Sequence, residues 1–184
     1  MWKRVSQQIL HENPYWSSIE EEYETSTGRR GRYYYARTPG SVLVVPQRSD
    51  GRFVLVRQYR YLWGGWGLEF PGGACDATAS PEERAVLELR EETGYCAQEW
   101  IALGSVSPCV GLLDERSRVY WAREAREVAA PSPEEGEEIE CVVCSAQEID
   151  QAIVSGTMWS GMSLSAWMLF RAFSGALSEP SMTR

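Results

Sequence analysis

The stretch that decides the fold runs from Gly72 to Tyr95 and reads GGACDATASPEERAVLELREETGY. Within it, Glu88, Glu91 and Glu92 stand at positions i, i+3 and i+4, a spacing that places three carboxylates on one face of an α-helix. Like charges at this spacing repel one another, which destabilises an isolated helix. Hard divalent cations such as Mg²⁺ bind carboxylate oxygens of this kind. The pattern therefore predicts a metal site on a helix.

The residues around the three glutamates predict where this helix begins and ends. Ser80, Pro81 and Glu83 form a capping box with proline at the first helical position, and Gly94 is suited to the left-handed cap that ends a helix. Between these ends, Ala85, Val86 and Leu89 predict an apolar stripe opposite the glutamates. Residues 67–73 look like a short strand leading into a glycine turn. The predicted order is strand, loop and helix.

This segment resembles the Nudix box, whose pattern is Gly, five residues, Glu, seven residues, Arg-Glu, an apolar residue, any residue, Glu-Glu, any residue, Gly and an apolar residue. The match places the three glutamates, Leu89, Gly94 and Tyr95 on box positions, with Gly73 on the first glycine. Two positions depart from the pattern: Ala79 stands where the family has its first glutamate, and Leu87 stands where it has arginine. Their joint replacement looks like the loss of one supporting ion pair.

Two other interpretations of the same stretch stay open. The first is an ordinary solvated acidic helix, which leaves the glycines and the Phe-Pro-Gly-Gly sequence before them unexplained. The second is a degenerate box in a nucleotide-binding or regulatory domain that keeps the fold without the chemistry. The departures at Ala79 and Leu87 are the reason to consider it.

The resemblance implies a set of functional residues. As metal ligands it implies Glu88, Glu91 and Glu92 together with the carbonyl of Gly72, holding Mg²⁺, with Mn²⁺ as an alternative ion. Glu91 is also a candidate catalytic base acting through water. In the ADP-ribose pyrophosphatase branch that base generally comes from a later acidic loop, here residues 133–138, which points to Glu135 first and Glu137 second.

The candidate substrate-binding residues lie outside the box. Arg60 offers a forked donor suited to a phosphate, although it could equally be a surface residue at the end of a strand. Glu69 and Glu115 match positions near the substrate in the family. Trp16 could stack on a nucleobase, as could Tyr34 or Tyr35, although any one of these aromatic residues could instead belong to the core or to an interface.

Composition limits the class of partner. The chain has 184 residues and a formal net charge of −8, which argues against binding nucleic acid through its phosphates. It has no long apolar run of the kind that spans a membrane and no signal peptide pattern, so we expect a cytoplasmic protein. Five cysteines, an odd number, suggest reduced thiols, and the CxxC of Cys141 and Cys144 lies in a strand-like run where the two side chains would face opposite sides.

The rest of the chain predicts an α/β fold. Strand-like runs at residues 41–46, 52–59, 100–106 and 117–122, with further helices from about residue 146 and residue 163, predict α/β or α+β by periodicity alone. The resemblance narrows this to a Nudix-type α/β/α sandwich with a mixed β-sheet and an N-terminal β-hairpin extension. The expected organisation is an extension over residues 1–40, a Nudix hydrolase domain over 41–176 and a loose tail over 177–184.

The resemblance also leads to an expected activity and assembly. We expect Mg²⁺-dependent hydrolysis of the pyrophosphate bond in a nucleoside diphosphate sugar, with ADP-ribose converted to AMP and ribose 5-phosphate as the leading case. The alternatives are another nucleotide sugar, of the GDP-mannose type, or a catalytically weak nucleotide-binding regulator. The N-terminal strands commonly exchange between subunits in this branch, and the aromatic run Tyr33-Tyr34-Tyr35 agrees with a homodimer.

Overall fold

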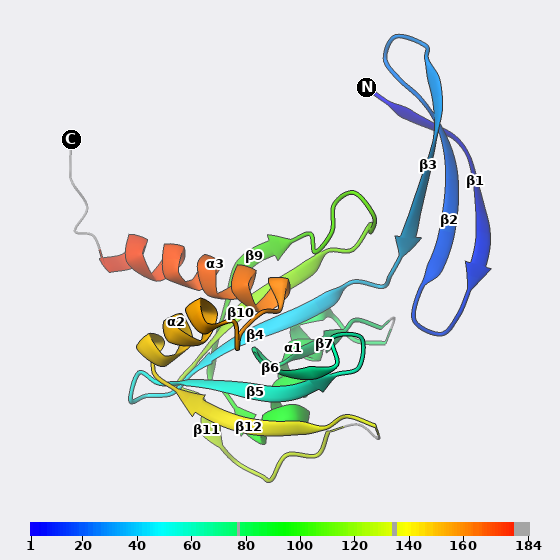
Figure 1. Cartoon of the computed structure of the whole chain (residues 1–184). Helices are drawn as coiled ribbons and strands as arrows, with labels where there is room; N and C mark the ends of the chain where they lie inside the picture. Colours follow the sequence, from blue (N-terminus) through cyan, green and yellow to red (C-terminus); the bar gives the residue numbers. More distant parts are fainter. Residues whose placement is uncertain (77, 134–135, 179–184) are drawn as a thin grey trace, which may run out of the picture. The chain divides into compact units, whose positions relative to one another are not determined.

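The computed structural model describes the whole chain except residues 77, 134–135 and 179–184 (Figure 1). The chain divides into two compact units. The first comprises Met1–Gly40 and Ser107–Arg116, and the second comprises Ser41–Val106 and Ser117–Arg184. Each is described by itself below.

A mixed sheet forms the centre of the second unit (Figure 1). Its main strands follow the order β12-β5-β4-β10-β9, with β6 paired to β5 and β7 paired to β4. Strand β10 runs parallel to β4, and the other pairs are antiparallel. The bounds are β4 Ser41–Gln47, β5 Phe53–Arg60, β6 Gly65–Glu69, β7 Gly72–Ala74, β9 Glu99–Val106, β10 Ser117–Arg123 and β12 Ile139–Cys144, with a separate pair β8 Tyr95–Cys96 and β11 Arg126–Glu127.

Helices cover both faces of this sheet because the central strands are apolar on both sides (Figure 1). In β4, Leu43 and Val45 join the apolar cluster that includes residues of α2 Ala146–Ser155 and α3 Gly161–Ser178. The alternate residues Val42 and Val44 join the cluster that includes residues of α1 Pro81–Thr93. The predicted α/β/α sandwich with a mixed sheet is therefore confirmed.

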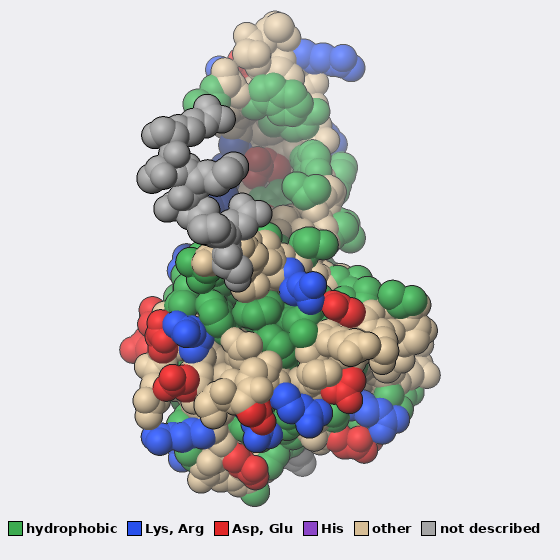
Figure 2. All heavy atoms as spheres, turned by 90° about the vertical axis from the view of Figure 1, so that its left-hand side faces the viewer, with side chains coloured by type: hydrophobic (Ala, Val, Ile, Leu, Met, Phe, Trp, Pro, Cys, Tyr) green, Lys and Arg blue, Asp and Glu red, His purple; other side chains and the backbone are tan. Residues whose placement is uncertain are grey.

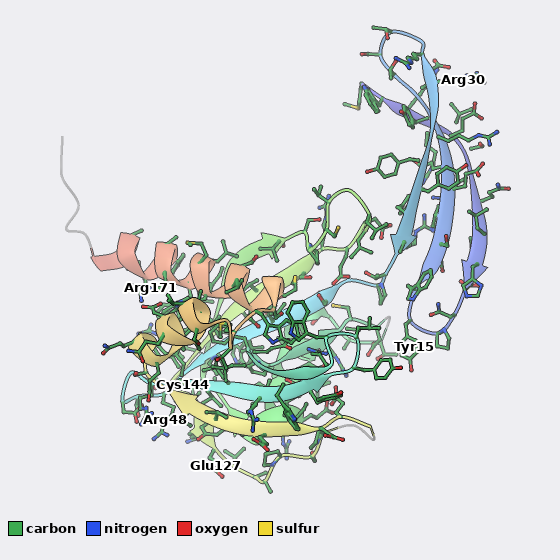
Figure 3. All side chains as sticks on the ribbon, viewed as in Figure 1. Tyr15, Arg30, Arg48, Glu127, Cys144 and Arg171 are labelled. Carbon is green, nitrogen blue, oxygen red and sulfur yellow. The ribbon has the colours of Figure 1, made fainter. Side chains whose placement is uncertain are left out.

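The two cysteines of the CxxC follow the same alternation. Cys144, labelled in Figure 3, is buried in the cluster on the α2 and α3 side, whereas Cys141 packs against the cluster on the α1 side. Both thiols are free. The prediction that these side chains face opposite sides of a strand is confirmed.

An antiparallel three-stranded sheet, in the order β1-β2-β3, makes up most of the first unit. The strands are β1 Lys3–Glu12, β2 Ser17–Glu24 and β3 Arg30–Arg37. Strands β2 and β3 form the predicted hairpin, while β1 was not predicted because its sequence is polar. Its pairing places Lys3 beside Glu24 at 2.9 Å, so the acidic central strand is compensated by basic residues on both neighbours.

The segment 107–116 completes the first unit. Ala36 of β3 forms a parallel bridge with Leu113, and the Tyr33 hydroxyl donates a hydrogen bond to the carbonyl of Gly111. Arg37 forms an ion pair with Asp114 at 3.4 Å. Residues far apart in the sequence thus lie side by side in this unit.

The surface carries charges of both signs. On the face shown in Figure 2, Lys and Arg side chains alternate with Asp and Glu side chains rather than gathering into an extended patch of one sign. No helix among the described residues is long and apolar enough to cross a membrane.

Phe170 provides a test of the core on the α3 side of the sheet. Its ring lies 5.1 Å from that of Phe53 and 5.2 Å from that of Trp121, and the residue is 5% exposed. We expect Phe170→Ala to lower the free energy of unfolding by about 3–5 kcal/mol. Met168→Ala on the same helix, at a residue that is 68% exposed, should change it by no more than about 0.5 kcal/mol. Urea denaturation followed by tryptophan fluorescence measures both changes, and equal losses would contradict this packing.

Candidate active site

Helix α1 begins and ends where the sequence predicts. The Ser80 hydroxyl accepts a hydrogen bond from the backbone N–H of Glu83 at 3.2 Å, and the Glu83 carboxylate accepts one from the N–H of Ser80 at 2.7 Å. Gly94 ends the helix in the left-handed region, with φ of 74°. This confirmed capping box fixes the helix that carries the acidic residues.

The acidic face of α1 is more buried than the sequence predicts. Glu88 is 6% exposed and Glu92 is 3% exposed, so these carboxylates lie beside the buried Ala85 and Leu89 rather than opposite them. Val86, expected in the apolar stripe, is 40% exposed, and that part of the prediction is wrong. The helix therefore buries two carboxyl groups against the protein. This burial costs free energy unless each group has a hydrogen-bond or charged partner.

The two glycines predicted to form a turn before the helix lie instead in strand β7, because they pair with β4, and they provide close contacts for both carboxylates. The backbone N–H of Gly72 donates a hydrogen bond to Glu92 Oε2 at 3.0 Å. The backbone of Gly73 lies so close to Glu88 that a Cβ there would collide with Oε1, and a Cβ at Gly72 would collide with the carbonyl of Val42. Glycine is thus required at position 72 by the approach of β7 to the backbone of β4, whereas a side chain at position 73 would displace the Glu88 carboxylate.

Burial and mutual repulsion perturb the two carboxylates. Burial raises the pKa of Glu92 from 4.5 to about 8, and the neighbouring charge of Glu88 adds to this rise. Burial also raises the pKa of Glu88, against the opposing effect of Arg84. Glu137 acts on both groups electrostatically. Such a concentration of perturbed carboxylates is typical of functional sites.

An arginine that sequence analysis missed contacts the first of these glutamates. Arg84 forms an ion pair with Glu88 Oε1 at 2.5 Å, with side chains that are 18% and 7% exposed. The signal was available in the sequence, because residues four apart on a helix are neighbours.

Arg60 and Glu69, both candidate substrate-binding residues, bind each other. The Nε and one Nη of Arg60 donate to the two carboxylate oxygens of Glu69 at 2.8 and 2.9 Å. This bidentate pair raises the pKa of Arg60, and the charges of Glu92 and Glu137 contribute further. The guanidinium group therefore interacts electrostatically with Glu92 and Glu137.

The acidic loop reaches the same region through its C-terminal end. The N–H of Tyr59, next to Arg60, donates a hydrogen bond to the carbonyl of Glu138 at 3.2 Å. Glu137 accordingly interacts electrostatically with Glu88, Glu92 and Arg60. Glu135, the first candidate for the base, lies outside the described residues.

Two predicted site residues belong to the first unit. Trp16 directly precedes β2, is 42% exposed and contacts the ring of His11 with centroids 5.9 Å apart. Glu115 is partly buried and follows Asp114, whose carboxylate accepts a hydrogen bond from the N–H of Thr38. Their role in binding substrate stays a prediction.

The oxygen atoms near Gly72 of β7 suit a hard divalent cation. Within the described part of the chain, no three His, Cys, Asp or Glu side chains stand together in an arrangement ready to hold a metal. Glu88 instead faces Arg84, and Glu92 faces the N–H of Gly72. Two buried carboxylates backed by glycine, with Glu91 acting on Glu88, nevertheless offer the oxygen ligands that Mg²⁺ prefers. The predicted set of Gly72, Glu88, Glu91 and Glu92 stays a prediction.

Comparison with known proteins identifies the family. The profile of the NUDIX domain matches residues 37–160, which include β7, α1 and the acidic loop. The chain therefore belongs to the Nudix family. Nudix hydrolases generally use divalent metal ions.

Similar proteins include hydrolases of several nucleotide compounds. A CMP-5'-(N-acetyl-N-hydroxy-3-aminopropyl)phosphonate hydrolase of Streptomyces rubellomurinus is 27% identical over 131 residues, covering 71% of this chain and 64% of its own. An ADP-ribose pyrophosphatase of Mycobacterium tuberculosis is 38% identical over 93 residues, covering 50% of this chain and 45% of its own. The matched regions thus span about half to two thirds of these relatives.

A solved structure shares the fold over nearly the whole chain. The crystal structure of an ADP compounds hydrolase superposes with a TM-score of 0.81 and 20% identity, and the match covers 96% of each chain. This likeness supports the same sandwich architecture, including the sheet that carries the site.

The raised pKa of Glu92 predicts how stability depends on pH. Between its ordinary value of 4.5 and about 8, the folded protein holds a proton that the unfolded chain releases. The free energy of unfolding should therefore fall as pH rises through this range in the absence of divalent metal. If Glu92 is a ligand of a divalent cation, as predicted, Mg²⁺ should reduce the fall by stabilising the ionised carboxylate of the folded state. Thermal unfolding at several pH values, with EDTA or with Mg²⁺, measures both effects.

Glu92→Gln is the control for this pH dependence. The amide cannot ionise, so this variant should show a smaller loss of stability between pH 4.5 and pH 8 than the parent chain. A parent chain whose stability rises over this range would contradict the assignment of a buried protonated carboxyl group.

Proposed function

We propose that this chain is a Mg²⁺-dependent hydrolase that cleaves the pyrophosphate bond of a nucleoside diphosphate sugar, with ADP-ribose as the leading substrate. The observation that carries the proposal is the burial of Glu88 and Glu92 against Gly72 and Gly73 of β7, with electrostatic interactions to Arg60 and Glu137. Carboxylates that repel one another in a buried site are the surroundings in which a divalent cation binds tightly.

The reaction adds water across a phosphorus–oxygen–phosphorus bridge. The water oxygen forms a bond to one phosphorus, the bridging bond to that phosphorus breaks, and the second phosphate leaves with the bridging oxygen. With ADP-ribose the products are AMP and ribose 5-phosphate. Mg²⁺, when bound, neutralises charge on the phosphate oxygens and lowers the pKa of water.

The side chains divide this chemistry between holding the cation, holding the phosphates and moving a proton. Glu88, Glu91 and Glu92, with the Gly72 carbonyl, are the proposed ligands of the cation. Arg60 is proposed to bind a phosphate oxygen, with its guanidinium plane already aligned by two hydrogen bonds to Glu69.

The water's proton needs a carboxylate outside the set that binds the cation. Among the described loop residues, Glu137 interacts electrostatically with both Glu88 and Glu92, which favours it as the proposed base. Glu135 and Glu91 remain the other candidates from the sequence.

The names of the relatives support a nucleotide substrate and suggest which ones to test. The M. tuberculosis relative is an ADP-ribose pyrophosphatase, whereas the S. rubellomurinus relative acts on a CMP-linked phosphonate. A cytidine-linked compound is therefore the second candidate. The homodimer and the cytoplasmic location stay predictions, and exposed aromatic residues of the first unit, such as Trp2 and Tyr34, support the former.

A substrate panel tests the proposed function. We expect the purified protein with Mg²⁺ to release AMP from ADP-ribose, measured by chromatography beside GDP-mannose, other ADP-sugars and a CMP-linked phosphonate. Glu92→Gln should abolish turnover with the fold retained, because it removes a proposed ligand. Glu82→Gln, at an exposed residue in the first turn of the same helix, is the matched control and should retain full activity.

Two outcomes would contradict the proposal. If the protein hydrolyses no member of the panel yet binds ADP-ribose in calorimetry, it is a nucleotide-binding regulator. If Glu92→Gln retains turnover, the assignment of this carboxylate to the cation is wrong.

A further inference from the structure

The family pattern has an arginine at the position of Leu87. Leu87 cannot form the ion pair that an arginine would form. Leu87 is 42% exposed and carries no charge. Arg84 lies three residues earlier in the same helix, so the two positions are neighbours on successive turns. An arginine is therefore present on this side of the helix, one turn closer to the N-terminus.

Arg84 holds the carboxylate of Glu88 in a confined position. The ion pair uses Glu88 Oε1, and the same oxygen lies against the backbone of Gly73. Glu88 thus lies between Arg84 and Gly73 of strand β7. A buried carboxylate of this kind would be costly without a charged partner.

Helix stability does not explain this ion pair. A basic residue four positions before an acidic one is the less favourable order on a helix. A cation near a helix N-terminus also opposes the helix dipole, and Arg84 stands in the fourth position of α1. The pair therefore fits a role in orienting Glu88 better than a role in forming the helix.

The loop before the helix contains a matching acidic residue. Asp76 lies three residues before Ala79, where the family has its glutamate, just as Arg84 lies three residues before Leu87. Asp76 accepts hydrogen bonds from the Thr78 side chain and backbone, which lower its pKa, and the charge of Arg84 contributes to the same shift. Both charged positions of the box thus have a counterpart three residues earlier in the sequence.

We propose that Arg84 is a positioning residue that replaces the missing arginine of the box by holding Glu88 from one helical turn earlier. The inference rests on the proposed function in that Glu88 is taken as a ligand of the cation. Arg84 acts through Glu88: it keeps the carboxylate in place against Gly73. The absence of an arginine at position 87 is then compensated by the ion pair between Arg84 and Glu88.

The test moves the arginine back to the family position. We compare Arg84→Leu, Arg84→Lys, Leu87→Arg and the double variant R84L/L87R, with Arg90→Leu as the matched control at an exposed arginine of the same helix. The first measurement is the Mg²⁺-induced rise in melting temperature without substrate, as a function of Mg²⁺ concentration. The second is the separate determination of kcat and KM on the best substrate of the panel.

The expected result is a loss on removal and a recovery on relocation. Arg84→Leu should raise the apparent Kd for Mg²⁺ by about tenfold or more, since losing a partner of a metal ligand typically costs about 10–100-fold in affinity or activity. It should lower kcat more than it changes KM. R84L/L87R should recover most of both losses, Arg84→Lys should be intermediate because lysine lacks the planar fork, and Arg90→Leu should match the parent chain.

The outcomes separate this inference from the proposed function. If the parent chain responds to Mg²⁺ and Arg84→Leu responds equally, Arg84 does not position Glu88. If R84L/L87R folds, by circular dichroism, but recovers nothing, position 84 has not replaced position 87. If the parent chain shows no response to Mg²⁺ at all, the proposed function fails together with this inference. Should Arg84→Leu not fold, Arg84→Lys with the parent's Mg²⁺ affinity and kcat would overturn the need for an arginine.

Discussion

The burial of two neighbouring carboxyl groups on one face of helix α1 is the constraint on which this site depends. Glu88 and Glu92 are almost fully enclosed, although α1 could have presented them to solvent. Each oxygen that is enclosed needs a donor or a cation, because water no longer solvates it. Within the protein, Glu92 accepts a hydrogen bond from the Gly72 N–H, and Glu88 forms an ion pair with Arg84 close to Gly73. Gly72 and Gly73 of β7 are thus as much a part of the site as the glutamates.

Much of the site could be predicted because its spacing is local. The capping box at Ser80, the end of the helix at Gly94 and the shared face of Glu88 and Glu92 all follow from helix geometry. Arg84 was not predicted as a site residue, although it stands four residues before Glu88 on the same helix. The family pattern places its arginine at Leu87 instead. The burial of Glu92 could not be predicted, since it depends on β7 and β4, which are distant in the sequence.

The sheet in the first unit shows a different limit of sequence reasoning. Strand β1 has few of the apolar residues that signal a strand, and its pairing is specified by opposite charges on β2, as between Lys3 and Glu24. Cross-strand charge pairs of this kind are visible only once the register is known. The hairpin of β2 and β3 was predictable because a glycine turn separates two strand-like runs.

The segment 107–116 has a consequence for how the protein can be divided experimentally. The chain passes between the two units at residues 40/41, 106/107 and 116/117, so the units are joined by three covalent connections rather than by one linker. Cutting the chain after residue 40 would leave Leu113 without its bridge to Ala36 and Asp114 without its ion pair to Arg37. Isolating the second unit therefore requires replacing residues 107–116 with a short loop as well as removing residues 1–40.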